Sequence, residues 1–321
     1  MPQTKKKPRA DDLADLSRLI ARMRAGERRA ISRAVTELER LSKTVPRLLE
    51  LMQPHLGAAL VVGFTGPPGA GKSTLVNAYT RHLRAEGKSI GIIAVDPSSP
   101  VSGGAILGDR IRMTATLEDD GVFMRSLASR GHLGGLSPAA VRIIDALDAA
   151  GKDIILIETV GTGQSEIDVA EVADVRVLVT APGLGDDIQA MKAGLLEIAD
   201  IVVVNKADRE GAERAVQQFK GALSLRAQGH GKVPVLRTTA TTGEGIAAVA
   251  KAIAELAAVR MAADPRDRRR RRARYLIARA AADAIAERVK AGEQGGLDAL
   301  ADAVLAGQLS PRDAAQKIIE G

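Results

Sequence analysis

Seven short apolar runs recur along the middle of the chain, and each is bounded by Gly, Pro, Asp or Asn. Their apolar positions are continuous and rich in β-branched residues, and stretches with helical periodicity separate one run from the next. Continuous apolar strands that alternate with helices are typical of a parallel sheet with helices on both faces. We therefore predict an α/β fold with a mostly parallel sheet flanked by helices. The predicted strands lie in residues 59–66, 89–96, 121–126, 153–161, 175–183, 200–208 and 233–240.

The residues before the first run carry a helical pattern instead. Apolar side chains recur at steps of three and four in residues 13–23, and again in residues 38–52. Such spacing places each set on one face of a helix. Gly26 lies between the two sets and predicts a break, so we expect two helices within residues 10–53 that pack against the next domain.

The strand pattern stops after the last run. Pro265 opens a stretch rich in Ala and Arg, and two helical segments follow that are divided by Gly292, Gly295 and Gly296. The chain therefore predicts three regions. They are an N-terminal helical region at residues 1–57, an α/β domain at residues 58–260 and a C-terminal helical arm at residues 261–321.

A glycine-rich segment follows the first apolar run directly. Residues 66–73 read GPPGAGKS and match G-x-x-x-x-G-K-S between a predicted strand and a predicted helix, which is the context this phosphate-binding motif requires. Its glycines let backbone N–H groups point at phosphate oxygens, and the helix N-terminus adds positive potential. We expect Lys72 to reach the β- and γ-phosphates and Ser73 to ligate Mg²⁺. The predicted nucleotide-binding residues here are Gly66, Pro67, Pro68, Gly69, Ala70, Gly71, Lys72, Ser73 and Thr74.

The sixth run ends in an N-K-x-D motif, formed by Asn205, Lys206, Ala207 and Asp208. The carboxylate of Asp208 can accept hydrogen bonds from the ring N–H and the exocyclic amine of guanine together. Adenine offers no matching pair of donors, so the motif predicts GTP or GDP. Thr239 and Ala240 end the next run and resemble the loop that contacts the guanine carbonyl oxygen through its backbone.

Carboxylates at the ends of neighbouring predicted strands are candidates for holding Mg²⁺, directly or through its waters. Asp96 and Glu158 each end a strand, and Asp109 lies in a glycine-rich loop where a solvated carboxylate is the alternative interpretation. Gly161, three residues after Glu158, can offer its backbone N–H to the γ-phosphate.

The residue that activates water stays open at this point. Asp96 is one candidate, and Gln164 is another by analogy with glutamines that orient water in other GTPases. Arg110 and Arg112 could act as an internal arginine finger, although loop arginines are more often solvated. Without such a finger we expect slow intrinsic turnover and a partner that completes the site.

Composition narrows the chemistry further. The 321 residues contain no cysteine, which excludes disulfides, a cysteine nucleophile and a cysteine-ligated zinc site. Histidines number 4. Aromatic residues make up 2% of the chain, so stacking platforms for single-stranded nucleic acid are not expected. No apolar run is long enough to span a membrane and the N-terminus does not resemble a signal peptide, so we expect a cytoplasmic protein.

The net charge of +7 favours phosphate-bearing or acidic partners. Its most conspicuous source is the arginine run at residues 268–272. The pattern favours a solvated start of a helix. Contact with an acidic partner surface or with CoA phosphates is an alternative, and nucleic acid is the least favoured partner because aromatic residues are missing around the run.

Four whole segments carry a more specific signal than the phosphate-binding motif alone. They read DPSSPVSGGAILGDRIRM (96–113), RSLASRGHLGGLS (125–137), ETVGTGQSE (158–166) and PGLGDDIQAMKAGLLEIADIVVVNKAD (182–208). Together they resemble the MeaB/ArgK family of P-loop GTPases, which includes the human methylmalonic aciduria type A protein. The resemblance covers about residues 60–321 and implies a P-loop NTPase fold of the SIMIBI type.

The resemblance implies a Mg²⁺-dependent GTPase that acts as a G-protein chaperone of an adenosylcobalamin-dependent methylmalonyl-CoA mutase or a related acyl-CoA mutase. Such a protein gates loading of the mutase cofactor and protects the mutase from inactivation. The resemblance also implies a homodimer formed through the C-terminal arm, and a mobile segment at residues 183–194 that conveys the nucleotide state. The catalytic and metal-binding positions that it implies are Lys72, Ser73, Asp96, Asp109 and Glu158.

Two other function classes remain as alternatives. A small-molecule kinase or transport-linked ATPase, as older descriptions of ArgK relatives have it, would use the same phosphate loop but normally with adenine. A GTPase linked to nucleic acid would use the arginine run and would bind with a steep dependence on salt.

Overall fold

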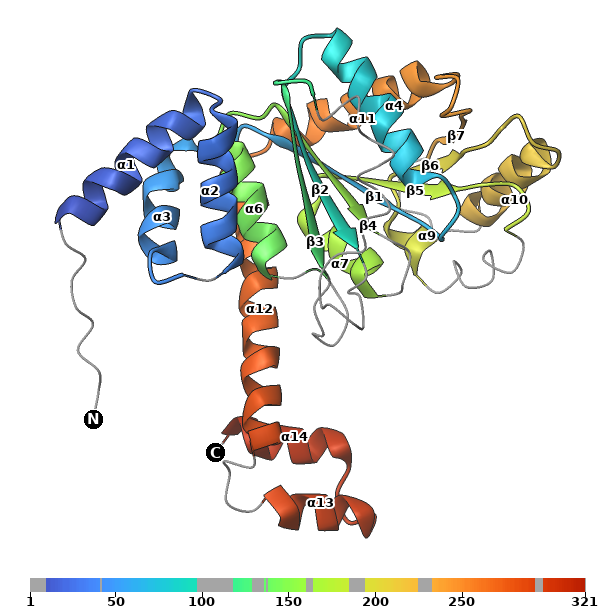
Figure 1. The fold of residues 1–321 in the computed structure, drawn as a ribbon. Coiled ribbons are helices and arrows are strands. Elements are labelled where there is room, and N and C mark those ends of the chain that lie inside the picture. The colour runs from blue at the N-terminus through green and yellow to red at the C-terminus, as the bar shows by residue number, and fades with distance from the viewer. Residues whose placement is uncertain are drawn as a thin grey trace. The chain divides into compact units, whose positions relative to one another are not determined.

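A parallel sheet of seven strands forms the centre of the part of the chain that the structure describes (Figure 1). This computed structural model describes residues 10–40, 42–96, 118–128, 136, 138–159, 164–184, 194–224, 233–291 and 297–320. The strand order is β3-β2-β4-β1-β5-β6-β7, and all neighbouring strands pair in parallel. The strands are β1 (Leu60–Thr65), β2 (Ile90–Asp96), β3 (Val122–Ala128), β4 (Ile154–Thr159), β5 (Val175–Thr180), β6 (Ile201–Val204) and β7 (Val235–Arg237).

The predicted α/β fold is confirmed, because each of the seven apolar runs overlaps one of these strands. Every residue of β1 and of β4 is buried, as expected for central strands that have helices on both sides. Five strands end before their predicted runs do, whereas β2 ends with its run at Asp96 and β3 continues two residues beyond its run, to Ala128.

Helices cover both faces of the sheet (Figure 1). Val62 and Phe64 of β1 lie in one apolar cluster with residues of α4 (Lys72–Ala85) and α11 (Ile246–Met261). The opposite face is covered in part by α10, whose Phe219 packs in a second cluster with residues of β5 and β6. The other helices of this face are α6 (Pro138–Ala149), α7 (Gln164–Val172) and α9 (Leu195–Ile198), beside α10 (Ala212–Ser224).

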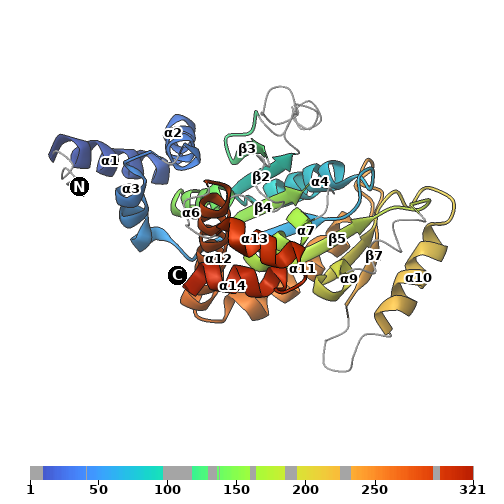
Figure 2. The same ribbon diagram turned by 90° about the horizontal axis from the view of Figure 1, so that it is seen from below.

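Three helices precede the sheet, where the apolar pattern predicts two. The break at Gly26 is confirmed, but the set in residues 38–52 is divided between two helices, with Leu41 outside the described residues. Pro46 explains the second break: a proline is tolerated in the first turn of a helix and disrupts a helix interior. The helices lie beside α6 (Figure 2) and are α1 (Ala10–Arg24), α2 (Arg28–Glu39) and α3 (Val45–Met52), followed by the short 3₁₀ helix η1 (Gln53–His55).

The chain divides into two compact units, Met1–Arg272 and Ala273–Gly321. The boundary falls inside α12 (Pro265–Ala291). Beyond the glycines at 292–296, which lie outside the described residues, the prediction of one helical segment is wrong. Two helices are present, α13 (Leu297–Leu305) and α14 (Pro311–Glu320), because Gly307 adopts a φ of +69° and Ser310 then caps α14 by accepting the N–H of Asp313 at 3.1 Å. No helix in the described ranges is both long and apolar enough to cross a membrane.

Asp148 of α6 contacts the residues that lead into β1. Asp148 is buried and accepts the backbone N–H groups of Gly57, Ala58 and Ala59 at 2.6, 3.1 and 2.9 Å. These bonds satisfy backbone donors just before the strand begins and so fix the entry into β1.

Asp145 lies one turn before Asp148 on the same helix. Burial, with a smaller contribution from the carboxylate of Asp148, raises the pKa of Asp145 to about 6 against the opposing charges of Arg272 and Arg269. The folded protein therefore holds a proton on Asp145 at pH values where an unfolded aspartate, with its ordinary pKa of 3.8, has released it. The free energy of unfolding falls as pH rises between these two values.

Asp200, just before β6, shows how neighbouring arginines reverse this effect. Burial raises the pKa of Asp200, but the hydrogen bonds and charges of Arg260 and Arg176 outweigh burial and lower that pKa to about 2. Asp145, with arginines nearby but none bonded to it in the described structure, keeps the upward shift that burial causes. Asp200 therefore adds stability above its ordinary pKa that is lost as pH falls towards about 2, whereas Asp145 loses stability as pH rises.

We expect Asp145→Asn to match the wild type in stability near pH 4 and to exceed it at neutral pH. A shift of about two pKa units corresponds to a difference of about 3 kcal/mol. Urea unfolding from about pH 4 to about pH 8 measures this difference. Asp120→Asn, at an exposed position, is the control. A stability gain that is the same at every pH would contradict the assignment.

Candidate functional site

The carboxyl ends of β4, β1, β5, β6 and β7 lie at one edge of the sheet, since these neighbouring strands are parallel. Ligands of open parallel sheets bind at this edge. The described part of the predicted nucleotide site lies at these strand ends, in the loops that follow them and in the first residues of α4.

The predicted phosphate loop joins the end of β1 to the start of α4. Gly66 has a φ of +137°, and a Cβ atom there would lie 2.0 Å from the carbonyl oxygen of Val179, so only glycine fits. Lys72, the first residue of α4, is buried and donates from Nζ to the carbonyl oxygens of Gly66 and Pro67 at 2.6 and 2.9 Å. The ammonium group is thus held inside the curve of the loop, where it can meet the charge of a phosphate.

Ser73 and Glu158 meet beside this loop. The Ser73 hydroxyl donates to Oε1 of Glu158 at 2.6 Å, and both side chains are buried. A hydroxyl and a carboxylate are oxygen donors of the kind Mg²⁺ prefers, so this pair fits the ion. Among the described residues no group of three histidine, aspartate or glutamate side chains could hold a metal. Phosphate oxygens and waters, which this ion commonly keeps, would be further ligands, beside the candidates Asp96 and Asp109.

Asn205 connects the phosphate loop to the loop after β7. Its buried side chain donates from Nδ2 to the carbonyl oxygens of Ala70 and Gly71 at 2.9 and 3.4 Å. Its Oδ1 accepts the hydroxyl of Thr238 at 3.1 Å and the N–H of Ala240 at 3.2 Å. One amide side chain therefore holds together the segments expected to bind phosphate and base.

Lys206 and Asp208, two other members of the N-K-x-D motif, have different surroundings. Lys206 adopts a φ of +57° and donates from Nζ to the carbonyl oxygen of Gly69 at 2.6 Å. Asp208 is exposed at the turn that follows, where its carboxylate is open to a ligand. Thr239 donates its N–H to the carbonyl oxygen of Glu244 at 3.0 Å, which closes the loop that carries Ala240.

The structure thus brings the phosphate loop, the Ser73–Glu158 pair and the N-K-x-D motif to one edge. Other candidates fall outside the described residues. They are Asp109, Arg110, Arg112, Gly161 and the side chains of Asp96 and Gln164. Sequence reasoning missed Thr238. The signal was present, since Thr238 belongs to a run of hydroxyl residues interrupted only by Ala240.

The family model described as "Methylmalonyl Co-A mutase-associated GTPase MeaB" matches residues 29–294, which is well over half of the chain. The chain belongs to the MeaB family. The resemblance noted in the sequence is therefore confirmed, and the protein is a P-loop GTPase.

Individual relatives agree with this assignment. A protein of Pyrococcus horikoshii described as a GTPase is 50% identical over 235 residues, which cover 72% of this chain and 74% of that one. The mitochondrial methylmalonic aciduria type A homolog of Mus musculus is 37% identical over 253 residues, which cover 72% of this chain and 60% of that one. A crystal structure of a protein described as an LAO/AO transport system kinase is 27% identical, covers 98% of this chain and 99% of that one, and has a TM-score of 0.75.

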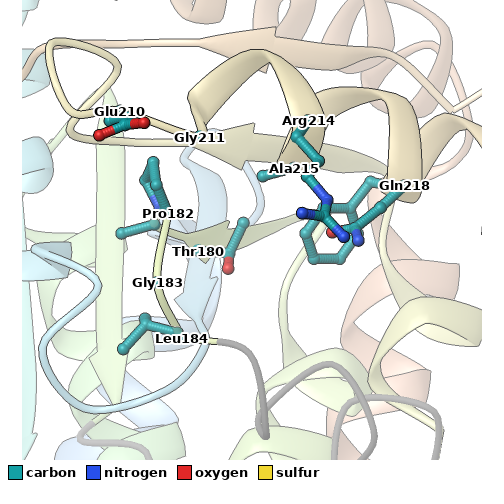
Figure 3. Close-up of a pocket in the computed structure, with 11 residues that line it drawn as sticks. Thr180, Pro182, Gly183, Leu184, Glu210, Gly211, Arg214, Ala215 and Gln218 are labelled. Carbon is teal, nitrogen blue, oxygen red and sulfur yellow. The ribbon is translucent and has the colours of Figure 1, made fainter.

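This MeaB-family GTPase also has a cavity of about 490 Å³ at the end of β5, between the residues that follow the strand and α10 (Figure 3). Thr180, Arg214 and Gln218 give it polar groups, and Leu184 and Phe219 give it apolar surface. The cavity lies on the α10 face of the sheet, whereas the phosphate loop continues into α4 on the opposite face. Gly183 and Leu184 begin the segment expected to convey the nucleotide state, and the rest of that segment to 193 lies outside the described residues.

The structure corrects the prediction made for the arginine run at residues 268–272. Arg268 and Arg272 are buried, so a fully solvated start of α12 is wrong. Both side chains form ion pairs with Asp174, whereas Arg270 remains exposed and pairs with Asp267 at 3.2 Å. Part of the run therefore belongs to the interior of the first unit and is not open to a nucleic acid.

We expect Asn205→Asp to weaken nucleotide binding by at least about tenfold and to lower the free energy of unfolding by about 1–3 kcal/mol. The substitution keeps the size of the side chain and the acceptor for Ala240, but it places a negative oxygen against the carbonyl oxygen of Ala70. Titration with GDP and urea unfolding measure the two effects. Gln308→Glu makes the same chemical change at an exposed position. Nucleotide affinity equal to that of the wild type would contradict the proposed connection.

Proposed function

We propose that this MeaB-family GTPase is a Mg²⁺-dependent molecular switch that acts as a chaperone of an adenosylcobalamin-dependent methylmalonyl-CoA mutase, or of a related acyl-CoA mutase. The observation that carries the GTP site is the connection made by Asn205 between the phosphate loop and the loop at Ala240. The match to a family named for its association with methylmalonyl-CoA mutase supports the partner.

In this proposal Lys72 neutralises charge on the β- and γ-phosphates, because its ammonium group already lies inside the loop. Ser73 and Glu158 hold Mg²⁺, with Asp96 and Asp109 as further candidates. When bound, the ion neutralises charge that develops on the phosphate oxygens during hydrolysis. Gly161 senses the γ-phosphate through its backbone N–H.

Base recognition is assigned to Asp208, with Thr239 and Ala240 offering backbone groups to the guanine carbonyl oxygen. The burial of Asn205 and its four hydrogen bonds support this role, because they fix the start of the motif that carries the exposed Asp208 against the phosphate loop. The residue that orients the attacking water is proposed to be Asp96 or Gln164. A partner is proposed to complete the site and accelerate turnover.

A homodimer through the C-terminal arm is part of the same proposal. In the second unit the apolar side chains of Ile277, Leu305 and Ile319 are exposed, at 69%, 85% and 56%. These apolar side chains are available for burial against a second copy of the chain.

A small-molecule kinase is the second candidate, because the solved structure with a TM-score of 0.75 is described as a transport system kinase. Nucleotide competition separates the two functions. Displacement of labelled GDP by GTP but not by ATP supports the GTPase switch, whereas equal displacement by ATP supports the kinase.

We expect the steady-state rate of GTP hydrolysis to be slow for the protein alone and to rise clearly when methylmalonyl-CoA mutase from the same organism is added. The physical reason is that the partner would add positive charge that stabilises the transition state, as an arginine finger does. Release of phosphate is the measurement. The control is Lys72→Ala with the mutase present, which should show no stimulated hydrolysis. A rate unchanged by the mutase would overturn the proposed partner while leaving the GTPase in place.

We expect Asp208→Asn to lose at least about tenfold in GTP affinity and to gain affinity for xanthosine triphosphate. Xanthine carries a carbonyl oxygen where guanine carries its exocyclic amine, so the amide of the variant can donate where the carboxylate accepted. Competition against labelled GDP measures both affinities, and circular dichroism checks the fold. Asp313→Asn in α14 is the control. Unchanged GTP affinity in the folded variant would contradict the assigned role of Asp208.

A further inference from the structure

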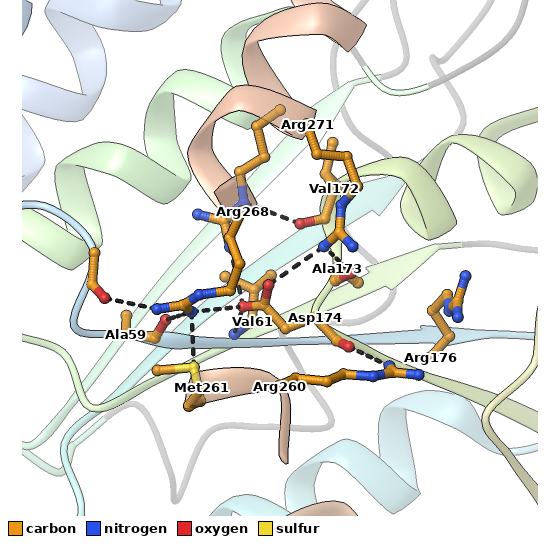
Figure 4. Close-up of polar contacts among 12 residues, drawn as sticks. Ala59, Val61, Val172, Ala173, Asp174, Arg176, Arg260, Met261, Arg268 and Arg271 are labelled. Atoms are coloured by element: carbon orange, nitrogen blue, oxygen red, sulfur yellow. Dashed lines mark hydrogen bonds and ion pairs between the residues drawn. The ribbon is translucent and has the colours of Figure 1, made fainter. Parts of the chain in front are cut away.

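Asp174 lies between α7 and β5 and is surrounded by arginines from the first turns of α12 (Figure 4). Its side chain is fully buried. One carboxylate oxygen accepts hydrogen bonds from Arg268 at 3.4 Å and Arg272 at 3.1 Å, and the other accepts one from Arg271 at 3.3 Å. We call these four residues the Asp174 clasp.

The clasp also holds the last carbonyl groups of α7. Arg272 donates from Nε to the carbonyl oxygen of Val172 at 3.0 Å, and Arg271 donates to that of Ala173 at 2.8 Å. Carbonyl groups at a helix C-terminus lack partners within the helix, and cations are favourable there. The arginines of α12 therefore fix the C-terminal end of α7.

The same aspartate is joined to the strand that leads into the phosphate loop. Its carboxylate accepts the N–H of Val61 at 3.0 Å, and its own N–H donates to the carbonyl oxygen of Val61 at 2.7 Å. Along β1, Gly63 allows α7 to pack directly on the strand, since a Cβ atom at this position would lie 2.2 Å from Cγ1 of Val169. The helix α7 is thus held against β1 at Val169 and by the clasp at its C-terminal end.

The N-terminal end of α7 is close in sequence to the residue that is proposed to sense the γ-phosphate. Four residues, 160–163, separate Thr159 at the end of β4 from Gln164 at the start of α7. Gly161, the proposed sensor of the γ-phosphate, is one of the four. A helix of 9 residues is a rigid rod about 13 Å long, so a displacement at its C-terminus moves its N-terminus as well.

The clasp contains more positive charge than is needed to neutralise the one carboxylate of Asp174. Three arginines share one buried carboxylate, and Arg260, which is paired with Asp200, donates to the backbone carbonyl of Asp174 as well. Burial and the positive charges of Arg272, Arg176 and Arg260 lower the pKa of Arg271, although Asp174 acts against this. Buried ionic groups contribute little net stability, and they can specify one arrangement of the elements they join.

We infer that Arg271 and Arg272, through Asp174 and the end of α7, are positioning residues for GTP hydrolysis. They hold α7, the helix that directly follows in sequence the segment with Gly161, the proposed sensor of the γ-phosphate. The inference rests on the proposed role of Gly161. It assigns to α12 an effect on the hydrolytic step at the opposite edge of the sheet, and not on the affinity for nucleotide.

The arginine run itself supplies the experiment and its control. Arg271→Ala removes one of three arginines and leaves Asp174 paired with Arg268 and Arg272, so the variant is expected to fold. Arg270→Ala is the matched control, since Arg270 is the adjacent residue, is 68% exposed and contacts only Asp267 in the described structure. We expect kcat for intrinsic GTP hydrolysis to fall by about 3- to 30-fold in Arg271→Ala. We expect the Kd for GDP and the KM for GTP to stay within about twofold, and Arg270→Ala to behave as the wild type.

Two lysine variants sharpen the test. Both hydrogen bonds of Arg271 come from a single terminal nitrogen, so the ammonium group of Arg271→Lys can replace it and should restore kcat. Arg272 uses Nε for Val172 and a terminal nitrogen for Asp174, and Arg272→Lys cannot make both bonds from one atom. We expect Arg272→Lys to remain slow, with unchanged GDP affinity.

Three results would overturn the inference. The first is a normal kcat in folded Arg271→Ala. The second is a parallel loss of GDP affinity, which would indicate general structural damage. The third is a kcat for Arg271→Lys as low as that for Arg271→Ala. The experiment contains no mutase, so a lack of stimulation by the mutase would overturn the proposed chaperone function without affecting this result.

Discussion

Backbone groups at the two edges of the parallel sheet need hydrogen-bond partners that the strands cannot supply, and buried polar side chains provide them. At the amino edge, Asp148 and Asp174 accept N–H groups of the residues that lead into β1 and of Val61. At the carboxyl edge, Lys72 and Asn205 donate to carbonyl groups of the phosphate loop. The central strand that carries the nucleotide site is therefore fixed at both ends. The loops of the site thus follow a strand whose entry and exit are both held by side-chain hydrogen bonds.

The fold follows from the sequence because its signal is local. A continuous apolar run bounded by Gly, Pro, Asp or Asn specifies a buried strand without reference to distant residues, and each of the seven runs overlaps a strand. The phosphate loop is also local, since eight consecutive residues contain the whole motif. The additional break before Pro46 could have been predicted from the proline alone. The break after Gly307 had a weaker signal, because a glycine followed by a serine cap is also common in loops.

The arginine run was misinterpreted because its partner is distant in sequence. Asp174 lies 94, 97 and 98 residues before the three arginines that contact it. Nothing around Asp174 distinguishes it from a solvated aspartate at the end of a helix. The spacing of Arg268 and Arg272 did place both on one face of α12, but helical periodicity cannot tell a charged face that is buried against a carboxylate from one that faces solvent. The same limit explains why Thr238 was overlooked, since its role depends on Asn205 of another strand end.

Through α7, the arginines of the clasp connect the two edges of the sheet, which usually have separate roles. The carboxyl edge binds ligand and the amino edge is generally regarded as structural support. In this protein α7 begins shortly after Thr159 at the first edge and ends in the clasp at the second. A helix fixed at its far end has fewer positions available at its near end, which follows Gly161, the proposed sensor of the γ-phosphate, in sequence. The clasp would then influence the rate of a step that depends on Gly161 while leaving the phosphate loop and the N-K-x-D motif untouched, because those segments are held by Lys72 and Asn205 instead.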